Sequence, residues 1–157
     1  MSFQVARAPG KLVQMVNTQT GAVASGTTVM PQDDTVPQIT EGDQYMTRTI
    51  TPKNAANVLV IEVVWNGASN TSGAMHVALF VGSTAAALAV VVDERPNGTM
   101  RAMAYSHRVV AGVTTELTFR VRAGLHTANT TTFNGFSVAR KYGGSVASSI
   151  TITEYAP

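Results

Sequence analysis

The sequence predicts an all-β fold, an antiparallel jelly-roll-like β-sandwich, on three observations. Only 13% of the residues are charged and 6% are aromatic, while Thr, Ala, Val, Gly and Asn are abundant, which favours short strands and turns. Asn-Gly pairs, which suit the positive φ angles of tight hairpins, recur at residues 66–67, 97–98 and 134–135. No stretch has a sustained helical period, and about ten short apolar segments fit a double-sheet sandwich.

The expected elements follow the chain between these turn signals. Residues 1–10 are expected to form an N-terminal arm and residues 11–157 a single β-sandwich domain, since a chain of 157 residues holds one core. The uncharged run 73–92 is as long as a membrane helix, but Gly-Ser-Thr at 82–84 interrupts it and predicts a hairpin with no membrane contact. Strands are predicted near residues 11–16, 26–30, 44–51, 57–65, 74–81, 86–92, 100–109, 115–123, 136–142 and 146–155.

Alternation separates strands with one apolar face from strands with two. Residues 115–123 place Leu117, Phe119 and Val121 on one face and arginines on the other, which is typical of an outer strand with one face in water. Residues 57–65 are apolar on both faces except at one glutamate, and residues 87–92 share this property. A thin sandwich has one core, so a neighbouring copy is expected to cover the second face in a homo-oligomer.

The charged groups divide unevenly along the chain. Through residue 94 there are four basic and seven acidic groups, and from Arg95 onward seven basic and two acidic, so the two parts carry about −3 and +5. This asymmetry allows the acidic part of one copy to meet the arginines of the next. No cysteine is present, which excludes disulfides and thiolate chemistry, and the opening MSFQVARAPGK predicts no secretory signal and synthesis in the cytoplasm.

The segment MPQDDTVPQITEGDQY, residues 30–45, contains four of the nine acidic groups. It lacks the spacing of a calcium loop, and adjacent carboxylates on an extended chain point apart, which does not suit glycoside hydrolysis. Pro31 and Pro37 predict an extended or turning connection with local bonds from side chain to backbone. A structural loop is therefore expected, with a metal site on a threefold axis and catalysis as the alternatives.

A second candidate surface combines basic and aromatic residues of the later part of the chain. Such a face would suit a nucleic acid or an acidic glycan, whereas outward arginines also protect strand faces and meet the acids of a neighbouring copy. The histidines are isolated, and nucleophile-elbow and P-loop motifs do not occur, so the sequence predicts no catalytic residue, metal or cofactor. The residues concerned are Arg101, Arg108, Arg120, Arg122, Arg140 and Lys141, with Phe133, Phe136 and Tyr142 nearby.

Two stretches carry a resemblance to a known family. From about Pro9 to Tyr155, and most strongly at TEGDQYMT (40–47) and ASSITITE (147–154), the chain resembles tailed-bacteriophage virion proteins. Members of this family are found alone or as C-terminal domains of tail-fibre and tip proteins. The middle, residues 66–115, diverges. The resemblance implies a jelly-roll knob comparable to the tumour-necrosis-factor-like trimers of phage spikes and needles, on the external surface of a virion made in the host cytoplasm.

The resemblance allows two locations for this protein on a phage particle, the capsid and the tail. A chain that begins with its own Met and has no coiled-coil shaft is expected first to be a homotrimeric capsid decoration or cement protein, with the major capsid protein as partner. The alternative is a receptor-binding knob of a tail fibre or tip, in which loops near 66–73, 93–99 and 124–135 contact a host surface glycan or protein. An enzyme, a membrane partner and a nucleic-acid partner are not expected. The candidate subunit or partner contacts are Asp33, Asp34, Glu41, Asp43, Val60, Glu62, Arg101, Arg120, Arg122 and Arg140.

Overall fold

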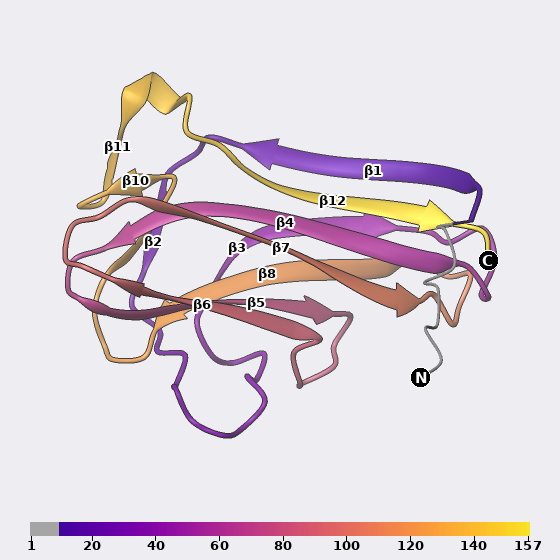
Figure 1. Cartoon of the computed structure of the whole chain (residues 1–157), viewed down its shortest axis with the longest axis horizontal. Coiled ribbons are helices and arrows are strands. Elements are labelled where there is room, and N and C mark those ends of the chain that lie inside the picture. The colour runs from indigo at the N-terminus through magenta and orange to yellow at the C-terminus, as the bar shows by residue number, and fades with distance from the viewer. Residues whose placement is uncertain (1–9) are drawn as a thin grey trace, which may run out of the picture.

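Two antiparallel sheets pack face to face in the computed structural model, which describes residues 10–157 (Figure 1). The predicted arm, residues 1–10, therefore lies outside the described residues except for Gly10. The first sheet contains β1 (Leu12–Thr20), β12 (Ser148–Tyr155), β4 (Val58–Ser69) and β7 (Arg101–Val110), extended by β9 (Thr131–Phe133) and β2 (Ala24–Gly26). The second sheet contains β3 (Asp43–Ile50), β8 (Leu117–Leu125), β5 (Gly73–Val81) and β6 (Ala89–Arg95).

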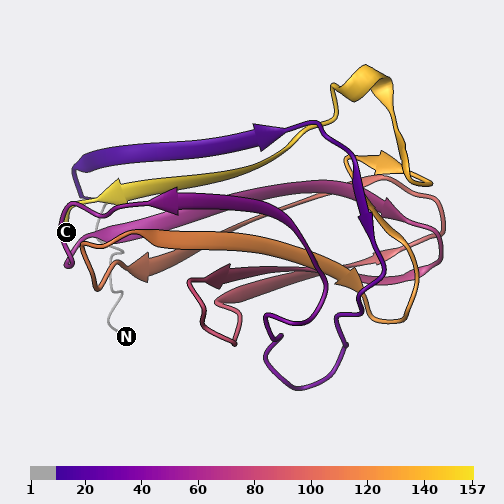
Figure 2. The same ribbon diagram turned by 180° about the vertical axis from the view of Figure 1, so that it is seen from behind.

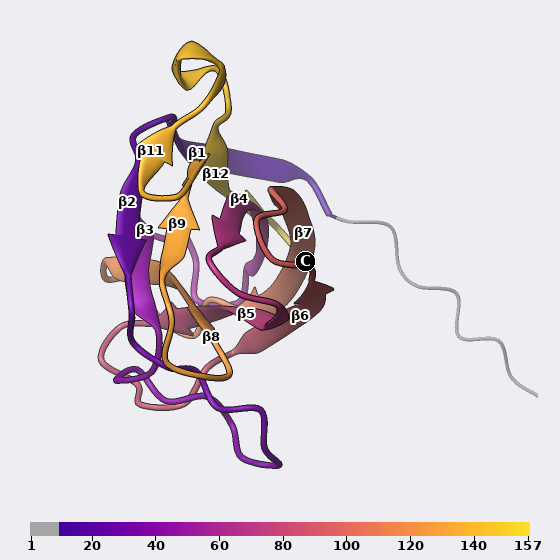
Figure 3. The same cartoon turned by 90° about the vertical axis from the view of Figure 1, so that its left-hand side faces the viewer.

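The strand order confirms the predicted jelly-roll-like sandwich. The first sheet runs β1-β12-β4-β7 and the second runs β3-β8-β5-β6, with every pairing antiparallel. Apart from the consecutive pair β5 and β6, neighbouring strands in the two sheets come from distant parts of the sequence, because the chain crosses repeatedly between the layers, as in a double Greek key. Figure 3 shows the two layers end-on, with the core between them. Within residues 10–157 no helix is long and apolar enough to cross a membrane.

Inward-facing side chains of period two fill the space between the sheets. Phe119, Val121 and Ala123 of β8 are buried as predicted, and they face the buried Leu59, Ile61, Val63 and Trp65 of β4. Trp65 lies at the centre of an aromatic cluster with Tyr45 and Phe133, at ring-centroid distances of 6.1 and 6.0 Å. The alternating sequence pattern therefore specifies both the strands and the core face.

One Asn-Gly pair is part of a strand and not a turn. Gly67 lies within β4, where the strand passes from pairing with β12 to pairing with β9. A Cβ at Gly67 would overlap the Trp65 ring and the carbonyl oxygen of Thr132, so glycine is required there by close packing. Asn97-Gly98 does form the predicted turn between β6 and β7, with Gly98 at φ +71°.

Two predicted strands are wrong in extent. Residues 27–30 leave the first sheet after β2, because the chain there crosses to the outer side of the second sheet. Residues 136–142 form only the two-residue strands β10 (Gly135–Phe136) and β11 (Ala139–Arg140), followed by the 3-10 turn η1 (Tyr142–Gly144). Left-handed backbone at Ser137, Val138 and Tyr142 interrupts the extended conformation that their side chains favour.

His76 on β5 makes stability depend on pH. The side chain is 6% exposed, and burial lowers its pKa, with a further lowering from nearby His126 that the Gly124 backbone and Glu94 oppose. Because the folded-state pKa lies below the unfolded value of 6.5, stability is expected to fall as pH drops below 6.5, by at most about 1.4 kcal/mol per pH unit. Urea unfolding of His76→Leu between pH 7 and 5 checks this, since that variant should lack the slope; an unchanged slope would contradict the assignment to His76.

Candidate functional site

The acid-rich segment is fastened to its own chain. Asp43 accepts hydrogen bonds from the Thr28 backbone N–H and hydroxyl, at 2.9 and 2.8 Å, and Glu41 accepts one from the Gln38 N–H at 2.9 Å. Asp33 accepts from the N–H and hydroxyl of Thr35, which lowers its carboxyl pKa. Asp34 is exposed. Asp33 and Glu41 therefore close local turns, and Asp43 ties the start of β3 to Thr28, as expected for a structural loop.

Residues 27–42 form a cover over the outer face of the second sheet, seen as the purple loop beneath β5 and β6 in Figures 1 and 2. Met30 is fully buried and packs with Ala78 and Phe80 of β5, which are also fully buried. Ala87, just before β6, packs on the same cluster. The apolar second face at Ala87 is thus covered within the chain, and no neighbouring copy is needed there.

Arg122 joins the cover to the sheet. Its Nε donates to the Glu41 carbonyl oxygen at 2.9 Å, and its Nη2 donates to the Gly42 carbonyl oxygen at 2.7 Å. Arg120, two residues earlier on β8, donates to the Gly82 carbonyl oxygen. Strand β8 lies inside its sheet, so the prediction of an outer strand is wrong, whereas its arginines do lie on the face opposite the core and are half-buried there.

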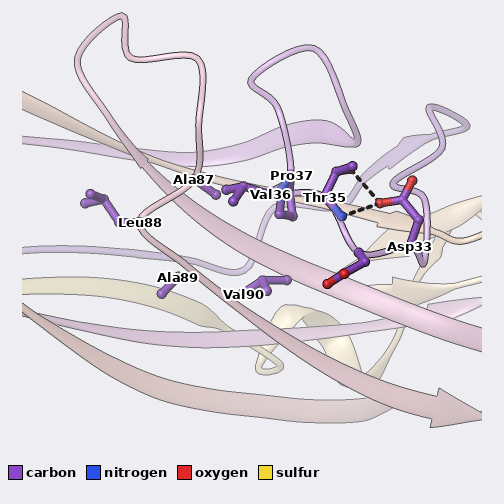
Figure 4. A pocket seen from close by; sticks show the side chains of 9 residues that line it. Asp33, Thr35, Val36, Pro37, Ala87, Leu88, Ala89 and Val90 are labelled. Carbon is purple, nitrogen blue, oxygen red and sulfur yellow. Dashed lines mark hydrogen bonds between the residues drawn. The ribbon is translucent and has the colours of Figure 1, made fainter.

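A recess of about 360 Å³ lies between the cover and the start of β6 (Figure 4). Asp33 and Asp34 line one side, and Val36, Leu88 and Val90 line an apolar part. Asp33 already accepts two bonds from Thr35, drawn as dashed lines in Figure 4. Among residues 10–157, no group of three or more His, Asp or Glu side chains is placed to hold a metal ion.

The predicted basic face is dispersed over the molecule. Arg101 pairs with Asp93 at 3.1 Å, whereas Arg120 and Arg122 lie on the outer side of the second sheet. Arg108 lies on the outer side of the first sheet, beside Val60 of β4. Arg140 is the last residue of β11, at one end of the sandwich, and Lys141 follows it. Phe133, predicted to adjoin this face, is a core residue with 2% exposure.

An apolar strip crosses the outer face of the first sheet, which carries the predicted contacts Val60 and Glu62. Met15, Thr153, Val60 and Arg108 form one row across the four strands, and Val110 lies opposite Val58 in the next row. Met15 and Val110 are 62% and 58% exposed, and Glu62 is exposed in the row on the other side of Val60. The strip is defined by Leu12, Val13, Met15, Val58, Val60 and Val110.

The apolar strip includes the second face of residues 57–65, which the sequence predicts to be covered by a neighbouring copy. Nothing within residues 10–157 buries it: Val58 and Val60 are half-buried, and Val64 is 36% exposed. Val90 and Val92 of β6 are likewise 47% and 52% exposed on the outer side of the second sheet. The predicted apolar second faces therefore exist on β4 and β6.

Loops from four parts of the chain meet at the end of the sandwich that carries β10 and β11 (Figure 1). The Gly98 N–H donates to the Ser69 carbonyl oxygen at 3.2 Å, and the Asn97 N–H donates to the Ser72 hydroxyl at 2.9 Å. The Asn70 N–H donates to the Thr130 carbonyl oxygen at 3.1 Å. The three loops predicted to act together, near 66–73, 93–99 and 124–135, are thus brought into contact.

The fourth loop, residues 134–147, completes a recess of about 390 Å³ at this end, here called the loop-end recess. The Lys141 Nζ lies 5.7 Å from the centroid of the Phe136 ring, a cation–π distance. Tyr142 is 79% exposed. The recess is lined by Gly98, Thr99, Met100, Phe136, Lys141 and Tyr142.

The described chain ends lie at the other end of the sandwich, away from the loop-end recess (Figure 1). The Ala156 N–H donates to the Lys11 carbonyl oxygen at 2.9 Å, which holds the start of β1 beside the end of β12. The apolar strip lies toward this end, since Val58 is opposite Tyr155 and Val110.

One buried carboxylate was not predicted. Glu154 is fully buried and accepts bonds from the backbone N–H of Lys53 at 2.8 Å, from the Asn57 amide and from the Gln14 amide. Burial raises its pKa, but these donors outweigh burial and leave the pKa below its usual value. The signal is present in ITITE (150–154), where an acid occupies the inward-facing position that follows Ile150 and Ile152.

Neither a protein-family model nor a curated protein sequence matches the chain. Among solved structures, a chain of infectious bursal disease virus Gx strain is 9% identical with a TM-score of 0.42, covering 99% of this chain and 41% of that one. Latent PorU of Porphyromonas gingivalis is 9% identical with a TM-score of 0.38, covering 96% and 14%. The enzymatically active domain of bacteriophage CBA120 tailspike protein 4 is 17% identical with a TM-score of 0.32, covering 76% and 18%. The chain thus spans less than half the length of each.

Proposed function

We propose that this chain is a non-enzymatic structural protein of a bacteriophage virion, a homotrimer that decorates or cements the capsid surface. The observation that carries the proposal is the apolar strip on the outer face of the first sheet. Exposed apolar groups gathered on one sheet face are typical of a protein contact, whereas scattered ones are not. The resemblance at TEGDQYMT and ASSITITE supplies the class of particle.

The strip favours a second copy of the chain as its occupant. Its four strands span about 14 Å and its rows extend over on the order of 300 Å², less than the roughly 800 Å² per partner of a stable interface. The contact must therefore continue into the neighbouring row, where Glu62 carries a negative charge, while Arg108 in the row of Val60 carries the opposite charge. Within residues 10–157 neither of these side chains forms an ion pair. A symmetric assembly would bring Glu62 of one copy to Arg108 of the next.

The two ends of the sandwich fit different roles on a particle. The apolar strip and the described chain ends lie toward one end, and the loop-end recess lies at the other. An assembly attached at the first end displays the loops outward.

Replacing Val60 by aspartate tests the assembly. Wild-type protein is expected to elute at three times the chain mass of 16.5 kDa, and Val60→Asp and Met15→Asp as monomers, because each buries a carboxylate in an apolar contact. Val138→Asp, which changes a 58% exposed valine at the other end, is the control and should stay trimeric. A wild-type monomer at tens of micromolar would overturn the trimer.

Binding to capsids tests the position on the particle. Wild-type trimers are expected to bind expanded capsids that lack them and to raise the capsid melting temperature. Val60→Asp should lose the avidity of three linked sites and bind more weakly. Binding to host cells without binding to capsids would instead select the second candidate.

The second candidate function is a receptor-binding knob of a tail fibre or tip. It is favoured by the loop-end recess, where the end of the 93–99 loop meets Phe136, Lys141 and the exposed Tyr142. Loops displayed from a rigid sandwich are suited to recognition, because their side chains are held without taking part in the core. Host-cell binding by the purified trimer is the measurement that separates this candidate from capsid decoration.

A further inference from the structure

We infer that the loop-end recess binds a carboxylated saccharide, with a sugar ring against Tyr142 and its carboxylate on Lys141. The biological role of this binding rests on the receptor-binding candidate described above. The binding itself is argued from the residues that line the recess.

Tyr142 supplies an apolar face in water. At 79% exposure it is the most exposed large hydrophobic residue among those the structure describes. A tyrosine ring offers flat apolar area with a polar tip and loses little rotamer entropy on binding, which is why such rings recur in recognition surfaces. The half-buried Phe136 continues this surface into the recess.

Lys141 supplies a positioned cation. Its ammonium group lies 5.7 Å from the Phe136 ring centroid, and the edge of that ring lies against Gly98, where an added Cβ would be 3.1 Å from Phe136 Cζ. Neither Lys141 nor the adjacent Arg140 forms an ion pair within residues 10–157. No acidic side chain lines the recess. A ligand carboxylate would therefore find a cation that is already oriented and that has no competing partner.

The backbone holds these side chains in place. Tyr142 adopts φ +49° and Val138 φ +59°, conformations that cost energy for residues with a Cβ. Three bonds close the turn around Tyr142: Gly144 N–H to the Lys141 carbonyl, and the Ser145 N–H and hydroxyl to the Tyr142 carbonyl. The Val138 N–H donates to the Thr132 hydroxyl at 3.1 Å and ties the loop to β9. A loop fixed this way binds with less loss of entropy.

The charge pattern favours a single carboxylate over a nucleic-acid strand. A phosphate backbone is bound by a track of cations, whereas among the side chains that the structure describes the recess has Arg140 and Lys141 beside it, with Arg101 paired to Asp93. The volume of about 390 Å³ lies at the small end of the range of ligand sites, about 300–1,000 Å³, which suits a short oligosaccharide.

Titration with tetragalacturonic acid and with its methyl ester tests the inference. Nuclear magnetic resonance titration of wild-type protein is expected to give saturable shifts at residues 98–100 and 136–142, with the ester at least tenfold weaker. Lys141→Gln should weaken the acid tenfold and leave the ester unchanged, and Tyr142→Ala should weaken both. Lys53→Gln, which removes an exposed charge near the opposite end, is the matched control and should bind as wild type.

Several outcomes would overturn the site. These are no saturable binding of the acid at millimolar concentration, equal weakening by Lys53→Gln, and a preference for a short oligothymidylate. Host-cell binding separates this inference from the candidate function. Cell binding that survives Tyr142→Ala and Lys141→Gln rejects this recess as the receptor contact while keeping the receptor-binding knob. Saccharide binding without cell binding supports the site and rejects the knob.

Discussion

Replacing Glu154 by alanine is expected to lower the free energy of unfolding by about 3 kcal/mol. The carboxylate is fully buried at the end of β12, where it accepts bonds from the Lys53 N–H, the buried Asn57 amide and the Gln14 amide. Alanine would leave the buried Asn57 amide and the Lys53 N–H without this acceptor, whereas the Gln14 amide keeps its bond to the Thr51 carbonyl oxygen. Urea unfolding measures the loss. Glu116→Ala, at an exposed site, is the control and should change stability by less than about 0.5 kcal/mol.

The Glu154 carboxylate also makes the free energy of unfolding depend on pH in the acid range. Its folded-state pKa lies below the unfolded value of 4.5, so the folded state binds its proton less readily. The stabilisation is therefore complete above about pH 4.5 and is lost as pH falls through the folded-state pKa. Glu154→Gln keeps the shape of the side chain but should lack this acid-dependent part. If both proteins lose stability in parallel below pH 4.5, the carboxylate is not the group responsible.

Replacing Phe80 by alanine is expected to cost about 4 kcal/mol and to loosen the cover of residues 27–42. Phe80 points away from the main core, yet it is fully buried because Met30 and Ile39 pack on it. The cavity left by alanine would remove most of the apolar contact that fastens the cover. Hydrogen exchange at the Met30 and Ile39 amides, which donate to Leu125 and Ala85 carbonyls, reports the loosening directly.

Val90→Ala provides the comparison for Phe80→Ala. Val90 lies on the same outer side of the second sheet but is 47% exposed, so its truncation should cost less than about 1 kcal/mol and leave exchange in the cover unchanged. Equal losses for the two variants would mean that the cover is held by its hydrogen bonds alone.

Residue alternation was sufficient to predict the sandwich. Phe119, Val121 and the inward residues of β4 were placed correctly, because period two in an apolar segment fixes both the strand and its buried face. Turn dipeptides were less reliable: Asn66-Gly67 has the composition of a hairpin, but the glycine serves the approach of Trp65 and Thr132. Only the fold decides between these two uses of glycine.

The candidate site was predicted in parts. The three variable loops were expected to act together, and they do meet, since they join strands that end at the same end of the sandwich. The sequence groups Phe136, Lys141 and Tyr142 with Arg140, which does adjoin them, but also with arginines of β7 and β8 that lie on other faces. Left-handed residues that carry a Cβ, such as Val138, contradict local propensity, so the shape of the 134–147 loop depends on tertiary contacts.

The length of β4 has a mechanical consequence. The strand runs from the side of the chain ends at Val58 to the loops at Ser69, and it is bonded along both edges, to β7 on one side and to β12 and then β9 on the other. A pull between the two ends of the sandwich is directed along this strand, while its ladder bonds lie across the pull. Such bonds carry the load together and in shear, so they do not open one at a time. The sandwich is thus expected to resist force most strongly along the line that joins its two ends.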